Sequence, residues 1–485
     1  MLGWSRAKNG YSIANLMKPL FFFFLLSTLA ISSERPNILF LLADDMRPDA
    51  IRALGNSRIQ TPNLDELVRR GTTFTQATCS YPICVVSRAE ILTGMHGWEN
   101  GIDGITNRFN EGVTFWAQTL ADAGYRTSYV GKWHTKGRPS ERGYDEVFGL
   151  FSGGGGKWWK ERQTDWKGFP ITGYRGWVFQ SDDGREKFPE KGVGLTPDID
   201  SKFADAAIEA IQAASPKPWF VHVNFTAPHD PLFLPPGMET LYRADEMEIP
   251  PNFLPEHPFD HGNFSGRDES LMAFPRTEAA TRDVLRVYYA VISYLDAQVG
   301  RILKVLDESG QRENTVVIFA SDHGMAVGSH GLRGKQNMYE HTVNVPLVIA
   351  GPEIKAHARS LAQVYLRDLY PTTCELAGVP IPGAVTAKSF AASLRRGDEP
   401  LREEIFGYFR DSQRMIRSDG WKLIVYPLAD KTQLFDLKSD PWETRNLADS
   451  PQALEIRQHL ETRLNSWRQN QGDPLLQSSG EGPEN

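Results

Sequence analysis

The strongest constraint on the fold is a regular alternation of short apolar runs with amphipathic stretches along most of the chain. The run at 37–43 (NILFLLA) is apolar throughout, which is typical of a strand buried on both faces. A helix is expected from Pro62 to Arg70, with Thr61 as its N-cap and Gly71 beyond its end. Repetition of this pattern predicts an α/β fold with a large, mostly parallel sheet flanked by helices.

The same reading places the other main elements. Helices are expected at 115–123, 198–214 and 277–308, and strands at 127–130, 219–225, 315–320 and 345–350. A further short helix is expected to be capped near Ser87 and to end at Gly94, so that Cys84 faces its N-terminus.

The chain divides into regions of different composition. Residues 33–400 form the predicted catalytic domain, with an aromatic and glycine-rich insertion at 151–194. Residues 401–470 predict a smaller α+β domain, an antiparallel sheet with one helix, and 471–485 a flexible tail. The tryptophans of the insertion either stack on sugar rings or bury themselves in a packed Ω-loop, and both interpretations stay open.

The first 32 residues have a targeting pattern. Arg6, Lys8 and Lys18 precede an apolar run, 19–31, that ends in small residues. This pattern predicts a signal peptide cleaved near 30–33, and therefore a secreted or periplasmic protein without a stable membrane span after cleavage. An uncleaved N-terminal anchor is the alternative.

The composition excludes some classes of protein and of function. The 485 residues are 40% apolar and 23% charged, which excludes a disordered chain. A net charge of −7 argues against general nucleic-acid binding, so no nucleic-acid partner is expected. Cys79, Cys84 and Cys374 are an odd set, so one of them is expected to do something other than pair.

Polar and charged residues repeatedly follow the expected strands. They are Asp44-Asp45, Lys132 with His134, His229, and Asp322-His323. In α/β sheets, ligands bind at the carboxyl edge of the strands, so these clusters indicate a site. Taken singly, each is as well explained by a turn or a structural side chain.

One motif gives the site a chemical identity. Cys84-x-x-Ser87-Arg88 followed by Leu92-Thr93-Gly94 resembles the signature of type I, formylglycine-dependent sulfatases of the alkaline-phosphatase-like superfamily. Other segments resemble that family in order: 36–45, 61–65, 131–134, 227–229, 321–324, 334–335 and 434–447. The resemblance covers about the whole mature chain, and Val86 departs from the proline usual at that position.

The resemblance implies roles for these residues. Cys84 would be oxidised to formylglycine by a formylglycine-generating or equivalent maturation enzyme, and its hydrate would attack sulfur. Arg88 would position the hydrate, Lys132 and Lys335 would hold the sulfate, and His134 and His229 would transfer protons. Five residues near these motifs in the sequence are candidates for substrate binding: Arg47, His96, Arg333, Gln336 and His341.

The resemblance also implies a metal. Asp44, Asp45 and Asp322 offer hard carboxylate ligands suited to Ca²⁺, with His323 and position 84 completing the set. Because imidazole is not a preferred Ca²⁺ ligand, another divalent metal remains open.

The expected activity is hydrolysis of sulfate esters, with a sulfated carbohydrate as the favoured substrate. The alternatives are a sulfamidase, a phosphate or phosphonate ester hydrolase of the same superfamily, and an unmodified pseudoenzyme that binds sulfated glycans.

Overall fold

In the computed structural model, residues 35–104, 107–160, 163–397, 401–471 and 473 are described. The predicted signal peptide lies outside these residues, as does most of the predicted tail. Of the helices in this part of the chain, none combines the length and apolar composition that crossing a membrane requires.

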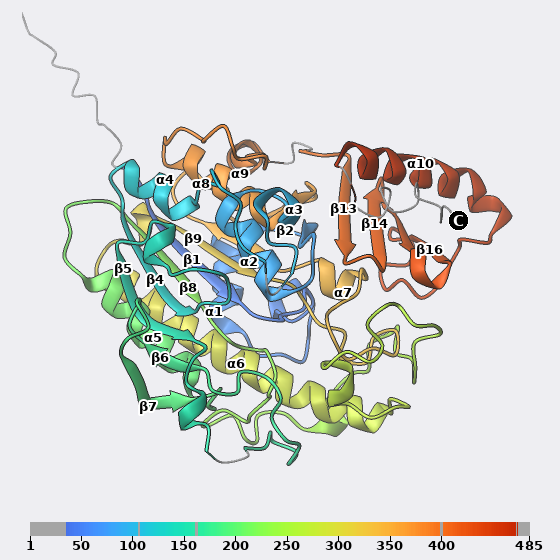
Figure 1. Ribbon diagram of the computed structural model, residues 1–485, viewed down its shortest axis with the longest axis horizontal. Coiled ribbons are helices and arrows are strands. Elements are labelled where there is room, and N and C mark those ends of the chain that lie inside the picture. Colours follow the sequence, from blue (N-terminus) through green and yellow to red (C-terminus); the bar gives the residue numbers. More distant parts are fainter. Residues whose placement is uncertain (1–34, 105–106, 161–162, 398–400, 472, 474–485) are drawn as a thin grey trace, which may run out of the picture. The chain divides into compact units, whose positions relative to one another are not determined.

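A ten-stranded sheet organises the larger part of the chain (Figure 1). Its strand order is β11-β2-β10-β9-β1-β8-β4-β5-β6-β7. The strands are β1 (Asn37–Ala43), β2 (Thr72–Phe74), β4 (Arg126–Lys132), β5 (Glu146–Ser152), β6 (Val178–Gln180), β7 (Lys187–Val193), β8 (Trp219–Asn224), β9 (Thr315–Ser321), β10 (Leu347–Ala350) and β11 (Ala358–Ser360). The central strands β9, β1, β8, β4 and β5 are parallel, which confirms the predicted fold class.

Helices cover both faces of this sheet. They are α1 (Pro62–Arg70), α2 (Cys84–Thr93), α3 (Gly97–Asn100), α4 (Trp116–Asp122), α5 (Ile199–Gln212), α6 (Glu278–Glu308), α7 (Glu340–Val343), α8 (Leu369–Leu376) and α9 (Ala391–Arg396). Alternate residues of β1 face the two sides: Leu39 and Leu41 pack in one core with α1, α5 and α6. Phe40 and Leu42 pack in the other core with α4 and α8.

Thr61 is the N-cap residue of α1 and Gly71 lies beyond its end, as expected, although the Thr61 hydroxyl makes no capping hydrogen bond. It accepts a hydrogen bond from the Arg52 N–H and donates one to Asp65. One local expectation was wrong. The insertion does more than cover the sheet edge, because β6 and β7 extend the sheet as antiparallel strands. The lack of periodicity in the insertion concealed these strands, since β6 has only three residues and β7 is half exposed.

A second, four-stranded antiparallel sheet follows. It consists of β13 (Glu404–Phe409), β14 (Gln413–Ser418), β15 (Trp421–Tyr426) and β16 (Lys431–Asp436), with α10 (Leu454–Asn470) packed on it. A small two-stranded pair, β3 (Ala77–Thr78) with β12 (Val364–Tyr365), completes the strands.

Candidate active site

The site is built at the carboxyl edge of the central strands. Because β9, β1, β8 and β4 are adjacent and parallel, their last residues open at one edge. Asp44 and Asp45 follow β1, Lys132 ends β4, and Asp322 follows β9. All four side chains are fully buried, so their charges act on one another with little screening.

Cys84 is the first residue of α2. The expected cap at Ser87 was wrong: the helix begins at Cys84 after Ile83, and the Ser87 hydroxyl donates to the Asp322 carbonyl at 2.7 Å. The expected end is correct, since Gly94 terminates α2 with a φ of 63°. All three cysteines are free and buried, so none forms a disulfide.

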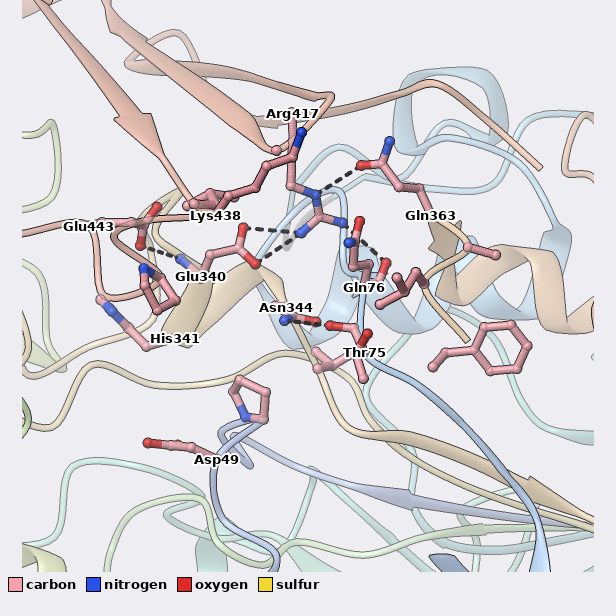
Figure 2. Close-up of a pocket in the computed structure, with 18 of the residues that line it drawn as sticks. Asp49, Thr75, Gln76, Glu340, His341, Asn344, Gln363, Arg417, Lys438 and Glu443 are labelled. Atoms are coloured by element: carbon pink, nitrogen blue, oxygen red, sulfur yellow. Dashed lines mark hydrogen bonds and ion pairs between the residues drawn. The ribbon is translucent and has the colours of Figure 1, made fainter. Parts of the chain in front are cut away.

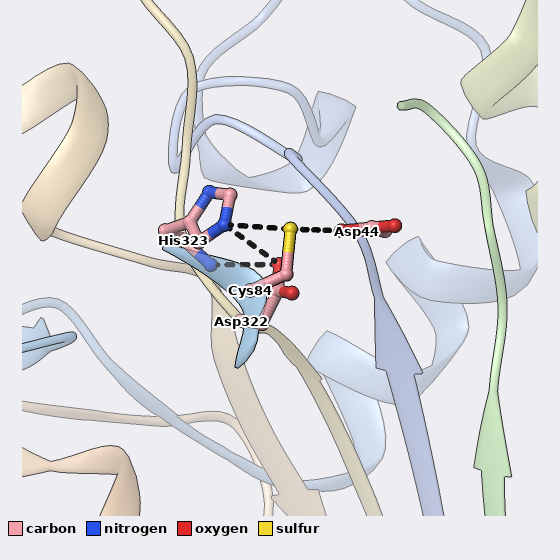
Figure 3. Close-up of side chains that lie close together, drawn as sticks. All are labelled: Asp44, Cys84, Asp322 and His323. Carbon is pink, nitrogen blue, oxygen red and sulfur yellow. Dashed lines mark hydrogen bonds and ion pairs between the residues drawn. The ribbon is translucent and has the colours of Figure 1, made fainter. Parts of the chain in front are cut away.

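The Cys84 sulfur lies among potential metal ligands (Figure 3). It lies 3.3 Å from Asp44 Oδ1 and 3.3 Å from His323 Nε2. Two overlapping groups have ligand atoms within 4.8 Å of one another: Asp44, Cys84, Asp322 and His323, and Asp44, Asp45, Cys84 and His229. Three buried carboxylates fit a hard divalent cation, while the imidazole makes the set less selective for Ca²⁺.

Three buried cations balance these carboxylates. Lys132 Nζ forms an ion pair with Asp44. Lys335 Nζ contacts both carboxylate oxygens of Asp45 at 2.9 and 3.0 Å and lies 3.5 Å from the Cys84 sulfur. Arg88 donates through Nε to Asp322 at 3.0 Å. An oxyanion brought to position 84 therefore meets fixed positive charge.

Two of these cations, together with His323, act on Cys84 itself. Burial alone would raise the pKa of the thiol, but Lys132, Lys335 and His323 hold it well below its usual value. An anion at this position is therefore stabilised, whichever group carries it.

The pKa values of His229 and His134 are shifted in opposite directions. Burial and Lys335 would lower the pKa of His229, but Asp45, Asp230 and Asp44 raise it above its ordinary value. Burial lowers the pKa of His134, although its interaction with Cys84 opposes this. At neutral pH His229 is therefore suited to donate a proton and His134 to accept one.

Further residues complete the site without having been singled out from the sequence. Tyr174, in the insertion, donates its hydroxyl to Asp44 Oδ2 at 2.9 Å, and its ring meets His229 edge-on. Asn224, the last residue of β8, accepts from Arg88 at 2.7 Å. Asp230 lies against His229 and is clamped by both guanidinium nitrogens of Arg267.

Only some of these had a sequence signal. Asn224 ends a buried strand and Asp230 adjoins a candidate histidine, so both were open to detection. Tyr174 lies in a stretch without periodicity, and nothing near it in the sequence points to Asp44.

A cavity of about 670 Å³ opens above Cys84. His134, His229, Lys335 and Gln336 line it, together with Tyr174 and Trp177 from the insertion. Trp177 thus lies where an aromatic ring can meet a ligand, whereas Trp159 packs tightly against Gly194. Packing inside the insertion is therefore observed for Trp159, while stacking of a sugar on Trp177 stays a prediction.

A larger cavity, about 1110 Å³, lies apart from this chemistry (Figure 2). It separates the catalytic sheet from the C-terminal sheet, and Arg47 and His341 line it. His96 bonds to Arg367 and stacks on Trp98, and Arg333 lines a third, smaller cavity. Of the five candidate substrate-binding residues, only Gln336 lines the cavity above Cys84.

Comparison with known proteins agrees with this geometry. A family model described as "Sulfatase" matches residues 36–379, and one described as "N-sulphoglucosamine sulphohydrolase, C-terminal" matches 328–470. A curated "Sulfatase" of Formosa agariphila is 28% identical over 439 residues, covering 86% of this chain and 84% of its own length.

Solved structures show the same fold. BT4656, determined in complex with its substrate D-glucosamine-2-N,6-O-disulfate, has a TM-score of 0.73 at 24% identity, covering 91% of this chain and 99% of its own. A phosphonate monoester hydrolase from Silicibacter pomeroyi has a TM-score of 0.74 at 22% identity, covering 91% and 96%.

The fold and the buried site define a hydrolase of the alkaline-phosphatase-like type. Because the sulfatase model matches well over half of its length, the chain belongs to the sulfatase family. It is accordingly a sulfuric ester hydrolase.

Proposed function

We propose that this sulfatase hydrolyses a sulfate ester on a carbohydrate, with formylglycine made from Cys84 as its nucleophile. The observation that carries the proposal is the placement of Cys84. It begins α2 beneath an open cavity, and Lys132, Lys335 and His323 stabilise negative charge there.

Oxidation of Cys84 would supply an aldehyde, whose hydrate offers a nucleophilic oxygen that a thiol lacks. Arg88 is fixed beside this position by Asp322 and Asn224, so it can orient the hydrate. Lys132 and Lys335 lie on the same side and neutralise the sulfate oxygens as charge builds on the leaving group.

His229 is the general acid for the departing alcohol. Its raised pKa keeps a proton on the ring at neutral pH, and it lines the cavity from which the alcohol leaves. His134 lies beside Cys84 with a lowered pKa, so it accepts the proton whose removal expels sulfate and restores the aldehyde.

Asp44, Asp45, Asp322 and His323 would hold a divalent metal together with position 84. Such an ion supplies Lewis-acid charge that a sulfate monoester needs when a nucleophile approaches. The buried carboxylates already require counter-charges, which Lys132 and Lys335 provide in part.

Two observations support a carbohydrate substrate. The C-terminal region matches a model named for a sulfohydrolase of N-sulfoglucosamine, and Trp177 and Tyr174 present aromatic rings to the cavity. The export predicted from residues 1–32 would suit an enzyme that acts on extracellular glycans.

The test is the mass of the tryptic peptide that contains Cys84, from protein made in its native host. Conversion to formylglycine replaces sulfur with oxygen and removes two hydrogens, so the peptide becomes lighter. The same preparation is assayed with 4-nitrophenyl sulfate and 4-nitrophenyl phosphate in competition.

A lighter peptide with faster sulfate hydrolysis supports the proposal. An unmodified cysteine with no hydrolysis would mean that Val86 blocks maturation, and a glycan-binding pseudoenzyme would then be favoured. Faster phosphate or phosphonate hydrolysis would instead assign the other branch of the superfamily.

A further inference from the structure

The C-terminal sheet contributes one charged residue to the catalytic cavity. Arg410 lies in the turn 410–412 between β13 and β14, and it lines the cavity above Cys84. Figure 1 shows these two strands in orange beside α7, away from the ten-stranded sheet. The rest of the cavity lining comes from the catalytic domain and its insertion.

This turn is held firmly against the cavity wall. The buried Gln413 donates through Nε2 to the His261 carbonyl at 2.9 Å and to the Gln336 carbonyl at 3.0 Å. A Cβ atom on Gly262 would come within 2.2 Å of Ser412 Cβ, so the loop 260–268 and the turn leave no space between them. The backbone at Arg410 is therefore held in a fixed position beside the cavity.

Arg410 differs from the other cations of the cavity. Lys335 is paired with Asp45, and Arg267 is paired with Asp230. Among the described residues, Arg410 has no carboxylate partner; its guanidinium lies over the Phe409 ring at 5.1 Å.

Two carboxylates line the same cavity. Asp268 is bound by Arg267 and by Gln336 Nε2, and Asp260 accepts the Gly262 N–H at 2.8 Å. Neither forms an ion pair with Arg410 in the described part of the chain, so the guanidinium is open to an anionic ligand.

The backbone adds a second, independent observation. Arg410 has a φ of 46°, the left-handed conformation that favours glycine and is costly for a long side chain. An arginine at this position therefore carries a backbone cost that a glycine would avoid.

We propose that Arg410 binds a second anionic group of the substrate, a carboxylate or a further sulfate, away from the scissile sulfate. This inference rests on the proposed function, and it narrows the substrate to a sugar carrying at least two negative charges. Both anions present paired oxygens that match the planar guanidinium.

The test uses inhibition of 4-nitrophenyl sulfate hydrolysis, because that substrate has no second anion. Inhibitors are N-acetylglucosamine 6-sulfate, D-glucosamine-2-N,6-O-disulfate and a sulfated disaccharide containing a uronate. For the wild-type enzyme we expect at least one dianionic sugar to inhibit about tenfold more tightly than the singly charged sugar.

Arg410→Gln should remove that advantage, raising the inhibition constant of the dianionic sugar about tenfold while changing kcat/KM for 4-nitrophenyl sulfate less than twofold. Arg410→Gly should do the same without lowering Tm, since glycine suits the backbone. Arg185→Gln, at a fully solvated surface arginine, is the charge-matched control.

The sugar that loses affinity identifies the anion as sulfate or carboxylate. Equal inhibition by singly and doubly charged sugars, or equal weakening of all sugars in Arg410→Gln, would overturn the inference. Absence of any 4-nitrophenyl sulfate hydrolysis by wild-type protein with formylglycine at position 84 would instead count against the proposed function.

Discussion

At the scale of single residues, the first prediction concerns His229, the proposed general acid. Its proton is retained by Asp45, Asp230 and Asp44 despite burial. We expect His229→Gln to slow hydrolysis of an alkyl or sugar sulfate by 10²–10⁴-fold, because a poor leaving group needs the proton.

The 4-nitrophenolate group leaves without protonation. The same variant should therefore hydrolyse 4-nitrophenyl sulfate with a much smaller loss of rate. Steady-state rates on the two substrates check this. If both fall equally, His229 has a structural rather than a proton-donating role.

Individual site residues were predictable where the sequence places them beside a recognisable strand. Asp44, Asp45 and Asp322 directly follow buried apolar runs, so their meeting at one edge follows from parallel pairing. Tyr174 and Arg410 reach the same cavity from segments that only tertiary packing brings there. Single-sequence patterns contain no signal for such contacts.

At the scale of elements, the hairpin β13–β14 packs closely against the loop 260–268. Gly262 has a φ of 91° and no room for a Cβ atom next to Ser412. We therefore expect Gly262→Ala to lower Tm by several degrees and to weaken turnover of sugar substrates.

Adding Ser412→Gly to that variant removes the clash but not the backbone strain. The double variant should regain part of the Tm, as followed by thermal unfolding. No recovery would show that backbone strain alone accounts for the loss.

Element boundaries followed the apolar periodicity closely where burial is complete. β1 and β9 match their expected ranges to within a residue because both faces are apolar. The direction of β10 was not evident, since an apolar run looks the same in parallel and antiparallel pairing. β6 and β7 are short or half exposed and lack that signal.

At the scale of the whole molecule, ion pairs join the C-terminal sheet to α7, and Figure 2 shows one of them, between Arg417 of β14 and Glu340. Lys422, fully buried in β15, lies 3.0 Å from Glu340 of α7 and 2.8 Å from Glu443. We expect Lys422→Met to lower the free energy of unfolding by about 3–5 kcal/mol, because it leaves the buried Glu443 carboxylate without its cation, whereas Glu340 keeps its ion pair with Arg417.

Urea unfolding monitored by near-UV circular dichroism measures this loss. The double variant Lys422→Met/Glu443→Gln also removes the unpaired carboxylate, so it should recover part of the lost stability. Equal instability of the single and double variants would rule out charge pairing as the cause.

Buried histidines near this junction predict acid sensitivity. Burial lowers the pKa of His257 to about 4 and of His261 and His330 to about 3. Since these values lie below the ordinary 6.5, the neutral rings stabilise the fold above that pH and the benefit is lost as pH falls. At pH 5 each of the three histidines lowers the free energy of unfolding by about 2 kcal/mol relative to its value at neutral pH.

Tm measured at pH 7.5 and 5 should therefore fall steeply for the wild-type protein. His330→Asn keeps a residue tolerated at the φ of 53° but cannot titrate, so its Tm should fall less between the two pH values. An identical fall would place the acid sensitivity elsewhere.

The turn 410–412 has a consequence for how enzymes of this type diversify. The floor of the cavity is encoded between residues 44 and 335, and the turn lies far downstream in a separate sheet. Because Ser412 is packed against Gly262 while Arg410 is exposed, a gene copy can change position 410 while the reaction chemistry stays intact. New substrate preferences can then arise without a non-functional intermediate.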